Sequence, residues 1–273
     1  MSEMRPSHHP KHTPPAQEPH VLSLAEGSTI KKVIGVASGK GGVGKSFVTS
    51  TLAVALARRD LKVGILDADI TGPSVPASFG LTGMLRTSDG KLIEPMVTKT
   101  GIKVVSVNLV LQSPDQPVIW RGPVLSQIIN QFWSEVDWGE LDVLLIDMPP
   151  GTGDVPLTIF QSIPVDGLIL VATAQDLASM IVKKARNMAT MMDVKILGMA
   201  ENMAYLKCPH CGEEIPLFGD GSAVVESADE IGVPVLDRIA FDPEVTKLVD
   251  SGRCEGTAEG IVEGCAEAVT KIL

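Results

Sequence analysis

The segment best suited to chemistry is a glycine-rich loop with the spacing Gly-x4-Gly-Lys-Ser. It consists of Gly39, Lys40, Gly41, Gly42, Val43, Gly44, Lys45 and Ser46, after an apolar run and before a helical pattern. Glycines let successive backbone N–H groups turn toward one anion, and the following helix presents its positive end to the same phosphates. We expect Lys45 to reach the β- and γ-phosphates and the Ser46 hydroxyl to ligate Mg²⁺. The loop therefore predicts a site for ATP and Mg²⁺.

Lys40 occupies a position that an ordinary P-loop leaves to any residue. A cation there can contact its own nucleotide, or the nucleotide of a partner subunit across an interface, as an arginine finger supplied in trans does. We therefore expect Lys40 to be a nucleotide ligand and, with Lys45, a catalytic residue. The simpler alternative is an exposed loop lysine.

Three aspartates follow apolar runs. Asp147 ends the run 143–146, where a Walker-B carboxylate holds Mg²⁺ directly or through water. Asp67 and Asp69 end an earlier run, and residues two apart on a strand share a face. Ligands bind at the carboxyl ends of strands in open α/β sheets, so both could face the metal and the attacking water. Gly151, in the turn after Asp147, is placed to sense a γ-phosphate.

A second candidate site is the turn Cys208-Pro209-His210-Cys211-Gly212. A Cys-x-x-Cys turn brings two thiolates to one metal or cluster, and it is compatible with half of a zinc knuckle, a redox pair or half of an iron–sulfur site. Cys254 and Cys265, with ten residues between them around a helical pattern, are interpreted as ordinary cysteines. Two thiolates per chain suggest a two-fold dimer that supplies four.

The elements that must position these residues alternate between strands and helices. Strands are expected at 33–38, 62–67, 103–110, 143–147, 167–173, 195–201 and 233–239, and helices at 46–59, 124–135, 157–163, 177–192, 243–250 and 258–272. The segment 74–101 is expected to be irregular or hairpin-like. Several strands are apolar throughout, as strands covered on both faces are. The fold class is therefore α/β, a doubly wound, mostly parallel sheet in a single P-loop NTPase domain.

Composition limits the domain count and the partners. Residues 1–29 are rich in Pro and His and are expected to be a flexible tail, with the ATPase domain and its inserted Cys-x-x-Cys loop at 30–273. A net charge of −10 argues against nucleic acid as a partner. The chain has no apolar run of about 18 residues, so no membrane span is expected, and the expected compartment is the cytoplasm.

These motifs together resemble the deviant Walker-A class of ATPases, which includes ParA, MinD and the nitrogenase iron protein. Within that class the sequence is most similar to the Mrp/ApbC family of iron–sulfur cluster carrier ATPases. The likeness covers residues 30–273 and rests on the glycine-rich loop, Asp67-Ala68-Asp69-Ile70-Thr71-Gly72-Pro73-Ser74, Trp120-Arg121-Gly122-Pro123, Asp147-Met148-Pro149-Pro150-Gly151-Thr152-Gly153-Asp154, and Glu201-Asn202-Met203-Ala204-Tyr205 leading into Cys208 and Cys211.

The resemblance implies an ATP-hydrolysing homodimer in which Lys40 reaches the opposite nucleotide, Asp69 positions the water and Asp147 opens switch II. It also implies that Asn202 contacts the adenine. Cys208 and Cys211 of each subunit would share a [4Fe-4S] cluster at the dimer interface, for transfer to apo iron–sulfur proteins. Some relatives carry a small N-terminal domain or an N-terminal four-cysteine site. The tail has no cysteine, so only the bridging site is predicted.

Two other functions remain open at this stage. A ParA/MinD-like positioning ATPase would need a membrane anchor or a nucleoid-binding surface. Residues 258–273 hold one lysine and three glutamates, whereas a membrane-binding helix is basic on its polar face. A zinc-bridged regulatory dimer is the other alternative, because thiolates accept both metals.

Overall fold

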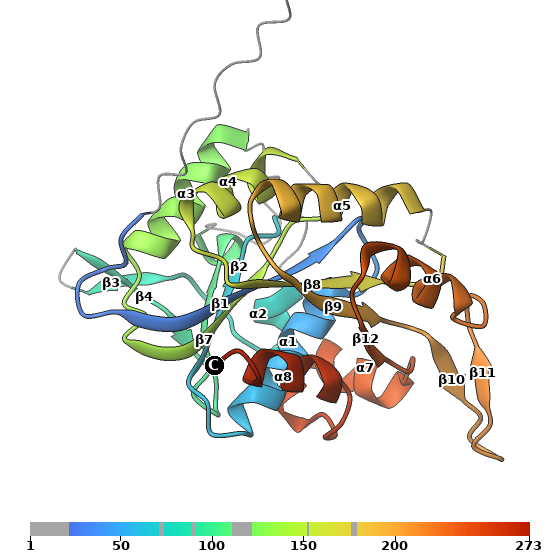
Figure 1. Cartoon of the computed structure of the whole chain (residues 1–273). Coiled ribbons are helices and arrows are strands. Elements are labelled where there is room, and N and C mark those ends of the chain that lie inside the picture. The colour runs from blue at the N-terminus through green and yellow to red at the C-terminus, as the bar shows by residue number, and fades with distance from the viewer. Residues whose placement is uncertain (1–21, 71–73, 89–90, 111–121, 152, 176–178) are drawn as a thin grey trace, which may run out of the picture.

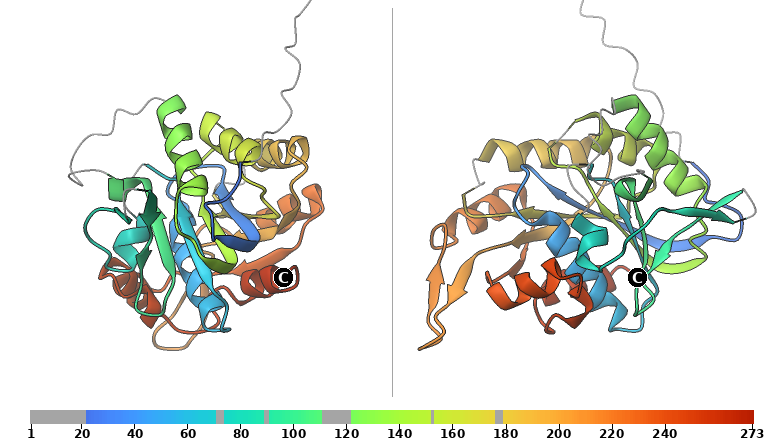
Figure 2. Two further views of the ribbon diagram at one scale, coloured as in Figure 1. Left: turned by 90° about the vertical axis from the view of Figure 1, so that its left-hand side faces the viewer. Right: turned by 180° about the vertical axis from the view of Figure 1, so that it is seen from behind.

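The computed structural model places one twisted sheet between two layers of helices (Figures 1 and 2). It describes residues 22–70, 74–88, 91–110, 122–151, 153–175 and 179–273. In this part of the chain eight strands form the main sheet, in the order β12-β9-β8-β1-β7-β2-β6-β5. All neighbouring pairs are parallel except β5 with β6. The doubly wound, mostly parallel α/β fold predicted from the sequence is therefore confirmed.

The strands of this sheet are buried because helices cover both of its faces. Every residue of β2 and of β8 is buried, which explains why their sequences are apolar throughout rather than alternating. The strands are β1 (Thr29–Ser38), β2 (Val63–Asp67), β5 (Met96–Val97), β6 (Lys103–Ser106), β7 (Glu140–Asp147), β8 (Gly167–Ala172), β9 (Ile196–Glu201) and β12 (Val235–Arg238).

Each face of the sheet has its own helix layer and its own hydrophobic core. One layer consists of α3 (Gly122–Ser134), α4 (Asp154–Ser162), α5 (Ser179–Met191) and α6 (Ser222–Ile231), above the sheet in Figure 1. The other consists of α1 (Lys45–Ala57), α2 (Ser74–Ser78), α7 (Pro243–Asp250) and α8 (Glu263–Thr270), below it. Two short 3-10 helices, η1 (Val107–Val110) and η2 (Cys254–Gly256), lie outside these layers of α-helices.

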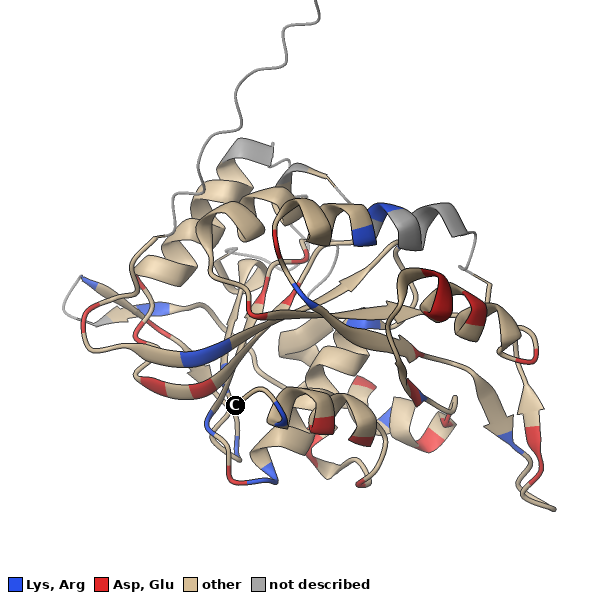
Figure 3. Ribbon diagram, viewed as in Figure 1, with Lys and Arg blue, Asp and Glu red and all other residues tan. Residues whose placement is uncertain are grey.

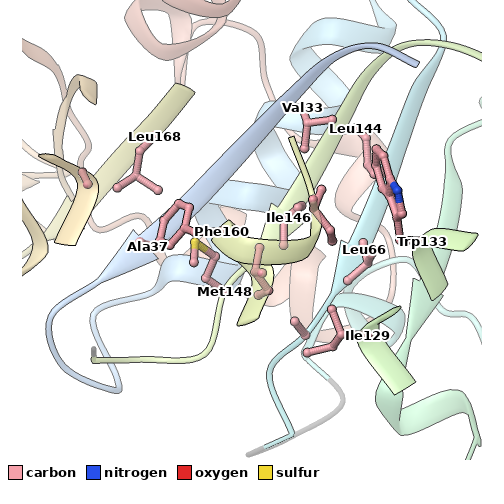
Figure 4. Packing of buried hydrophobic residues seen from close by; sticks show 14 of the residues in the cluster. Val33, Ala37, Leu66, Ile129, Trp133, Leu144, Ile146, Met148, Phe160 and Leu168 are labelled. Carbon is pink, nitrogen blue, oxygen red and sulfur yellow. The ribbon is translucent and has the colours of Figure 1, made fainter. Parts of the chain in front are cut away.

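Figure 4 shows the core between the sheet and the layer of α3–α6, called the first core below, which is built mainly from aliphatic side chains. Ile129 and Trp133 of α3 belong to the same cluster as Leu66, Leu144 and Ile146 from the sheet. Burying one such side chain fully contributes about 1.5–3 kcal/mol, so a dozen of them hold the sheet rigid. The carboxyl ends of the central strands, which carry the candidate site, are thereby fixed in position.

One predicted strand is shorter than expected. The strand predicted at 103–110 ends at Ser106, and Val107–Val110 form the 3-10 helix η1. The Asn108 backbone N–H donates to the Ser106 hydroxyl at 3.1 Å, a local turn that competes with strand pairing.

The C-terminal helix is also shorter than the predicted 258–272, since α8 covers only Glu263–Thr270. Gly260 has a φ of 82°, in the left-handed region, which a right-handed helix cannot contain. The chain before α8 is therefore a turn rather than the first part of the helix.

Helix α6 was not predicted, although its sequence carries the expected signals. Val224, Ala228 and Ile231 are buried at helical spacing, and Gly232 ends the helix with a φ of 72°. The segment 74–101 does contain a hairpin, of β3 (Arg86–Ser88) with β4 (Leu92–Glu94). The Cys-x-x-Cys turn lies on a second hairpin, of β10 (Tyr205–Lys207) with β11 (Glu214–Pro216), which projects from the body of the molecule (Figure 1).

The packed part of the chain extends into the segment 1–29 that the sequence predicted as a tail. The Leu22 N–H donates to the Ser162 carbonyl at 3.0 Å, and Trp133 Nε1 donates to the Leu22 carbonyl at 2.8 Å. Ala25 is buried. Residues 22–28 therefore pack against the hydrophobic core that α3 and α4 share with the sheet.

Candidate functional site

The glycine-rich loop joins the carboxyl end of β1 to the first turn of α1, as the sequence predicts. Gly42 and Gly44 have φ values of 84° and 81°, a left-handed conformation that costs glycine least. Gly44 also lacks room for a side chain, because a Cβ there would lie 2.1 Å from Asn202 Nδ2. The loop needs glycine for its conformation at both positions, and at Gly44 for space as well.

Asp147, at the end of β7, is the centre of a buried polar cluster. Lys45 Nζ lies 2.8 Å from Asp147 Oδ1 and 3.3 Å from Asp69 Oδ2. The Ser46 hydroxyl donates to Asp147 Oδ2 at 2.5 Å, and the Thr49 hydroxyl donates to Oδ1 at 2.8 Å. Lys45 and Asp147 are both almost fully buried. The first turn of α1 is thus tied to the end of β7 by one lysine and two hydroxyls.

Asp67 and Asp69 take different positions. Asp67 lies opposite Asp147 in the parallel β2–β7 register, accepts from the Ser106 hydroxyl at 2.8 Å and accepts from the Asp69 N–H at 3.1 Å. Burial, reinforced by the nearby Asp147 carboxylate, raises the pKa of Asp67 well above its ordinary value. Strand β2 ends at Asp67, so Asp69 lies beyond the strand and the two side chains do not share one strand face. Of the two, only Asp69 borders the cavity that is described next.

A cavity of about 480 Å³ opens in front of the cluster, a size suited to a nucleotide. It is lined by the glycine-rich loop and the first turn of α1, by α2 and Asp69, and by Asn202, Met203, α7 and the residues that precede α7. The lining residues from the predicted site are Gly41, Gly42, Gly44, Lys45, Ser46, Asp69 and Asn202.

The turn after β7 rests against the glycine-rich loop. The Gly151 N–H donates to the Ser38 carbonyl at 2.9 Å, and Gly151 has a φ of 87°. Pro150 lines the cavity, 3.9 Å from where a Cβ of Gly41 would lie. The structure therefore places Gly151 beside the candidate phosphate cradle, while Thr152 lies outside the described residues, as do Thr71–Pro73 and Arg121.

Asn202 ties the end of β9 to the glycine-rich loop. Its side-chain amide donates to the Val43 carbonyl at 2.9 Å, and its backbone N–H donates to the Ala172 carbonyl at 2.8 Å. Asn202 is buried and borders the cavity, and so does the neighbouring Met203. Asn202 therefore supports the loop and is accessible to a ligand in the cavity.

Lys40 and Gly39 lie at the rim of this arrangement. Lys40 is exposed, its carbonyl accepts from the Ser38 hydroxyl at 2.9 Å, and it is not among the residues that line the cavity of its own chain.

The donor groups around Lys45 suit an anion together with a hard cation. Backbone N–H groups at the start of α1 and the Lys45 ammonium favour phosphate oxygens. The Ser46 hydroxyl and the Asp147 carboxylate offer oxygen ligands, which Mg²⁺ prefers over nitrogen or sulfur. The residues present therefore fit a nucleotide phosphate with a bound Mg²⁺.

The Cys-x-x-Cys turn forms a compact knuckle at the tip of the β10–β11 hairpin. The Cys208 N–H donates to the Glu213 carbonyl and the Gly212 N–H donates to the Cys208 carbonyl, both at 2.9 Å. Hydrogen bonds from the backbone of Cys211 and then His210 lower the pKa of Cys208. Cys208 is half-buried, Cys211 is exposed, and both are free thiols. The knuckle therefore holds two thiols in one turn, of which Cys211 is exposed to solvent.

No group of three or more His, Cys, Asp and Glu residues able to hold a metal occurs among the described residues of the chain. The knuckle thus supplies two thiols and needs further ligands from elsewhere to complete a four-ligand site. Cys254 and Cys265 do not provide them. Both are fully buried, and burial raises the pKa of the Cys254 thiol to about 12 and that of Cys265 further.

Several residues of the site were not found from the sequence. Thr49 follows Lys45 by one helical turn, a spacing that could have identified it. Ser106 and Phe241 carry no local signal, because they reach the site only through the packing of β6 and of the segment before α7.

The charge distribution is mixed over the view in Figure 3, with acidic residues on α6 and α8 and basic residues on α5. Among the described residues, no helix combines the length and the apolar character that crossing a membrane requires.

The sequence matches the family model described as ParA, NUBPL iron-transfer P-loop NTPase, over residues 29–273. It is 47% identical over 233 residues to an iron–sulfur cluster carrier protein of Clostridium perfringens, covering 83% of this chain and 81% of that protein. It is 48% identical over 226 residues to an iron–sulfur cluster carrier protein of Methanocaldococcus jannaschii, covering 82% and 78%.

Solved structures give the same result for the fold. A nucleotide-binding protein of Archaeoglobus fulgidus, solved in complex with ADP, superposes with a TM-score of 0.75 at 43% identity and covers 85% of this chain and 92% of its own. The cell division ATPase MinD of Pyrococcus furiosus superposes with a TM-score of 0.61 at 21% identity, covering 89% of this chain and 100% of its own, a likeness of fold alone.

Proposed function

The chain belongs to the ParA/NUBPL family of iron-transfer P-loop NTPases, and from this premise we propose that it is an ATP-dependent iron–sulfur cluster carrier. In this proposal two copies of the chain assemble a [4Fe-4S] cluster between them and pass it to apo-proteins. The observation that carries the proposal is the pairing of a P-loop cavity with an exposed two-thiol knuckle, joined by the single short strand β10.

The roles proposed for residues that bind the nucleotide follow from the buried polar side chains around Asp147. Lys45 contacts the β- and γ-phosphates, and the Ser46 hydroxyl and Asp147 hold Mg²⁺. Asp69, within 3.3 Å of Lys45 Nζ, is positioned at the cavity wall to orient the attacking water. Gly151 lies beside the loop and would respond to a γ-phosphate. Asn202, which borders the cavity, would contact the base.

We propose that the iron–sulfur cluster is bound between two chains, because one chain supplies only half of the thiolate ligands. A [4Fe-4S] cluster takes four thiolates, and one knuckle supplies two. A two-fold dimer brings together two identical knuckles without any further sequence requirement. The exposure of Cys211 lets an acceptor protein approach the cargo.

The decisive measurement is the iron, sulfide and zinc content of protein that is reconstituted without oxygen. We expect about four iron and about four sulfide per dimer, and no bound zinc. Cys208→Ala should lose the cluster while it still binds ATP, and Cys254→Ala, which removes a buried thiol elsewhere, should keep it. Retention of the cluster by Cys208→Ala would rule out the bridging site. Stoichiometric zinc without sulfide would instead indicate a zinc-bridged dimer.

The role of Lys40 is tested by turnover. Lys40 is exposed and does not line the cavity of its own chain, which is compatible with a role in trans, so Lys40→Ala should bind ATP nearly normally. Its hydrolysis rate should fall by about 10³-fold or more, as for loss of an arginine finger. Lys31→Ala, at a surface lysine paired with Asp142, is the control. Normal hydrolysis by Lys40→Ala would exclude the role in trans.

A further inference from the structure

A three-residue turn connects the P-loop cavity to the thiol hairpin. Strand β9 ends at Glu201, β10 begins at Tyr205, and Cys208 follows β10 directly. Between the strands, Asn202 and Met203 both border the cavity. In Figure 1 the β10–β11 hairpin leaves the sheet at this point. Any rearrangement of the turn therefore changes the direction in which the hairpin projects.

Met203 holds the turn in a strained conformation. Its φ is 53°, in the left-handed region, where side chains other than glycine, asparagine and aspartate are rare. Among the described residues the other non-glycine cases are Asp60 and Asp193, and aspartate tolerates this region better. A methionine in this conformation persists only where its surroundings hold it there.

The surroundings of the turn belong to the cavity. The Asn202 amide donates to the Val43 carbonyl at 2.9 Å, and Met203 Cε lies 3.6 Å from where a Cβ of Gly44 would be. The Ala204 N–H donates to the Ile239 carbonyl at 2.9 Å, close to the wall that precedes α7. The turn is thus held by the glycine-rich loop at Asn202 and Met203, and by Ile239 at Ala204.

The hairpin in turn is bound to the same segments. The Phe241 N–H donates to the Tyr205 carbonyl at 2.8 Å, and Phe241 lines the cavity. The Leu217 N–H donates to the Ala204 carbonyl at 3.3 Å. Because β10 and β11 are paired along their length, the hairpin moves as one body.

We propose that the Asn202–Met203 turn is the link through which a nucleotide in the P-loop cavity positions the Cys208 and Cys211 thiols. The inference rests on the proposed function, since it assumes that the cavity takes a nucleotide. A ligand that contacts Asn202, Met203 or Phe241 differently in two arrangements of the turn shifts the population between them. Because the backbone of Met203 is restrained, a change in the arrangement of the turn also moves β10, and with it the knuckle that holds Cys208 and Cys211.

The test uses the metal-free, reduced full-length protein. The rates at which iodoacetamide alkylates Cys208 and Cys211 are measured by peptide mass spectrometry, with and without saturating Mg²⁺ and a non-hydrolysable ATP analogue. In the wild type we expect the nucleotide to change these rates by about fivefold or more, the lower end of ordinary coupling between sites. The buried Cys254 and Cys265 provide internal references that should react slowly throughout.

Met203→Gly should bring the ratio of rates close to one, because glycine lets the chain on either side of the turn move independently. Asp193→Gly is the matched control, since it makes the same change at a residue of similar φ that lies after α5, away from the turn. It should keep the ratio of the wild type. The proposal is overturned if the wild type shows no nucleotide effect, or if Met203→Gly binds the analogue and keeps the full effect.

If Met203→Gly fails to bind the analogue, the comparison is made in Met203→Asn. Asparagine accepts a positive φ and stays more restrained than glycine, so the ratio should be retained. A ratio near one in Met203→Asn that binds the analogue overturns the proposal. The assay needs no cluster. A wild-type protein that assembles the cluster normally but shows no nucleotide effect on alkylation would contradict this inference alone, and failure of cluster assembly would contradict only the proposed function.

Discussion

At the scale of single residues, two buried carboxylates lie next to each other behind the glycine-rich loop, and only one of them contacts Lys45. Asp67 and Asp147 lie opposite each other on neighbouring strands, and both are buried. Lys45 contacts Asp147 directly, while Asp67 relies on hydrogen bonds from Ser106 and Asp69. This arrangement keeps negative charge where a metal ion would bind, at a cost to the free energy of folding.

Asp67→Asn is therefore expected to stabilise the metal-free protein at neutral pH. The pKa of Asp67 is raised in the folded protein, so its carboxyl costs stability above that raised pKa and costs nothing below its ordinary value of 3.8. Thermal unfolding in the presence of EDTA should give a midpoint higher by about 2–4 °C at pH 7.5, the shift that ~1 kcal/mol produces in a domain of this size. The gain should shrink as the pH falls toward 4.

Asp142→Asn is the control, because the pKa of Asp142 is shifted in the direction opposite to that of Asp67. A hydrogen bond from Lys31 lowers the pKa of Asp142, so its carboxylate contributes stability above its ordinary pKa, and that contribution is lost as the pH falls. This variant should be neutral or slightly less stable at pH 7.5. If Asp67→Asn is less stable than the wild type at neutral pH, the Asp67 carboxyl does not cost the protein stability.

At the scale of elements, the glycine-rich loop depends on the end of β9. Gly42 and Gly44 share nearly the same φ, but a Cβ would meet nothing within 4 Å at Gly42 and would lie 2.1 Å from Asn202 Nδ2 at Gly44. The two positions therefore separate the cost of the backbone conformation from the cost of crowding. Asn202 is what makes the second position different.

Gly44→Ala should accordingly destabilise the protein more than Gly42→Ala does. Both variants lose about 1 kcal/mol or more to the left-handed conformation, and only Gly44→Ala also displaces the Asn202 amide from Val43. Urea unfolding followed by circular dichroism measures the difference, which should be about 1–3 kcal/mol. Equal losses in the two variants would show that the contact between β9 and the loop has no energetic role.

At the scale of the whole molecule, the N-terminal boundary of the domain is open to test. Residues 22–28 cover the first core through Ala25 and accept a hydrogen bond from Trp133 at Leu22. A chain that begins at Leu22 should unfold at the same temperature as the full chain, as expected for a flexible tail. A chain that begins at Thr29 should unfold at least about 3 °C lower, because a buried indole N–H loses its partner.

Equal melting temperatures for the chains that begin at Leu22 and Thr29 would place the boundary at residue 29, where the sequence predicted it. Differential scanning calorimetry of the three chains, under the same metal-free conditions, decides between these results. A lower melting temperature for the chain that begins at Leu22 would contradict the expected tail.

The sequence alone determined the fold class, the glycine-rich loop, Asp147 and the cysteine turn. These features depend on short-range patterns, such as glycines before a helix, an apolar run that ends in an aspartate and two cysteines in one turn. The pattern of buried strands also located nearly all of the main sheet, although α6 was missed and the ends of β6 and α8 were misplaced.

Only the tertiary structure decided which groups meet at the cavity. Sequence spacing treats Asp67 and Asp69 alike, whereas the end of β2 buries one against Asp147 and turns the other toward Lys45. Nor does spacing reveal that Met203 and Phe241, distant in sequence, line one cavity and hold the thiol hairpin. The physical reason is that such contacts come from the packing of elements far apart in the chain, which no local pattern encodes.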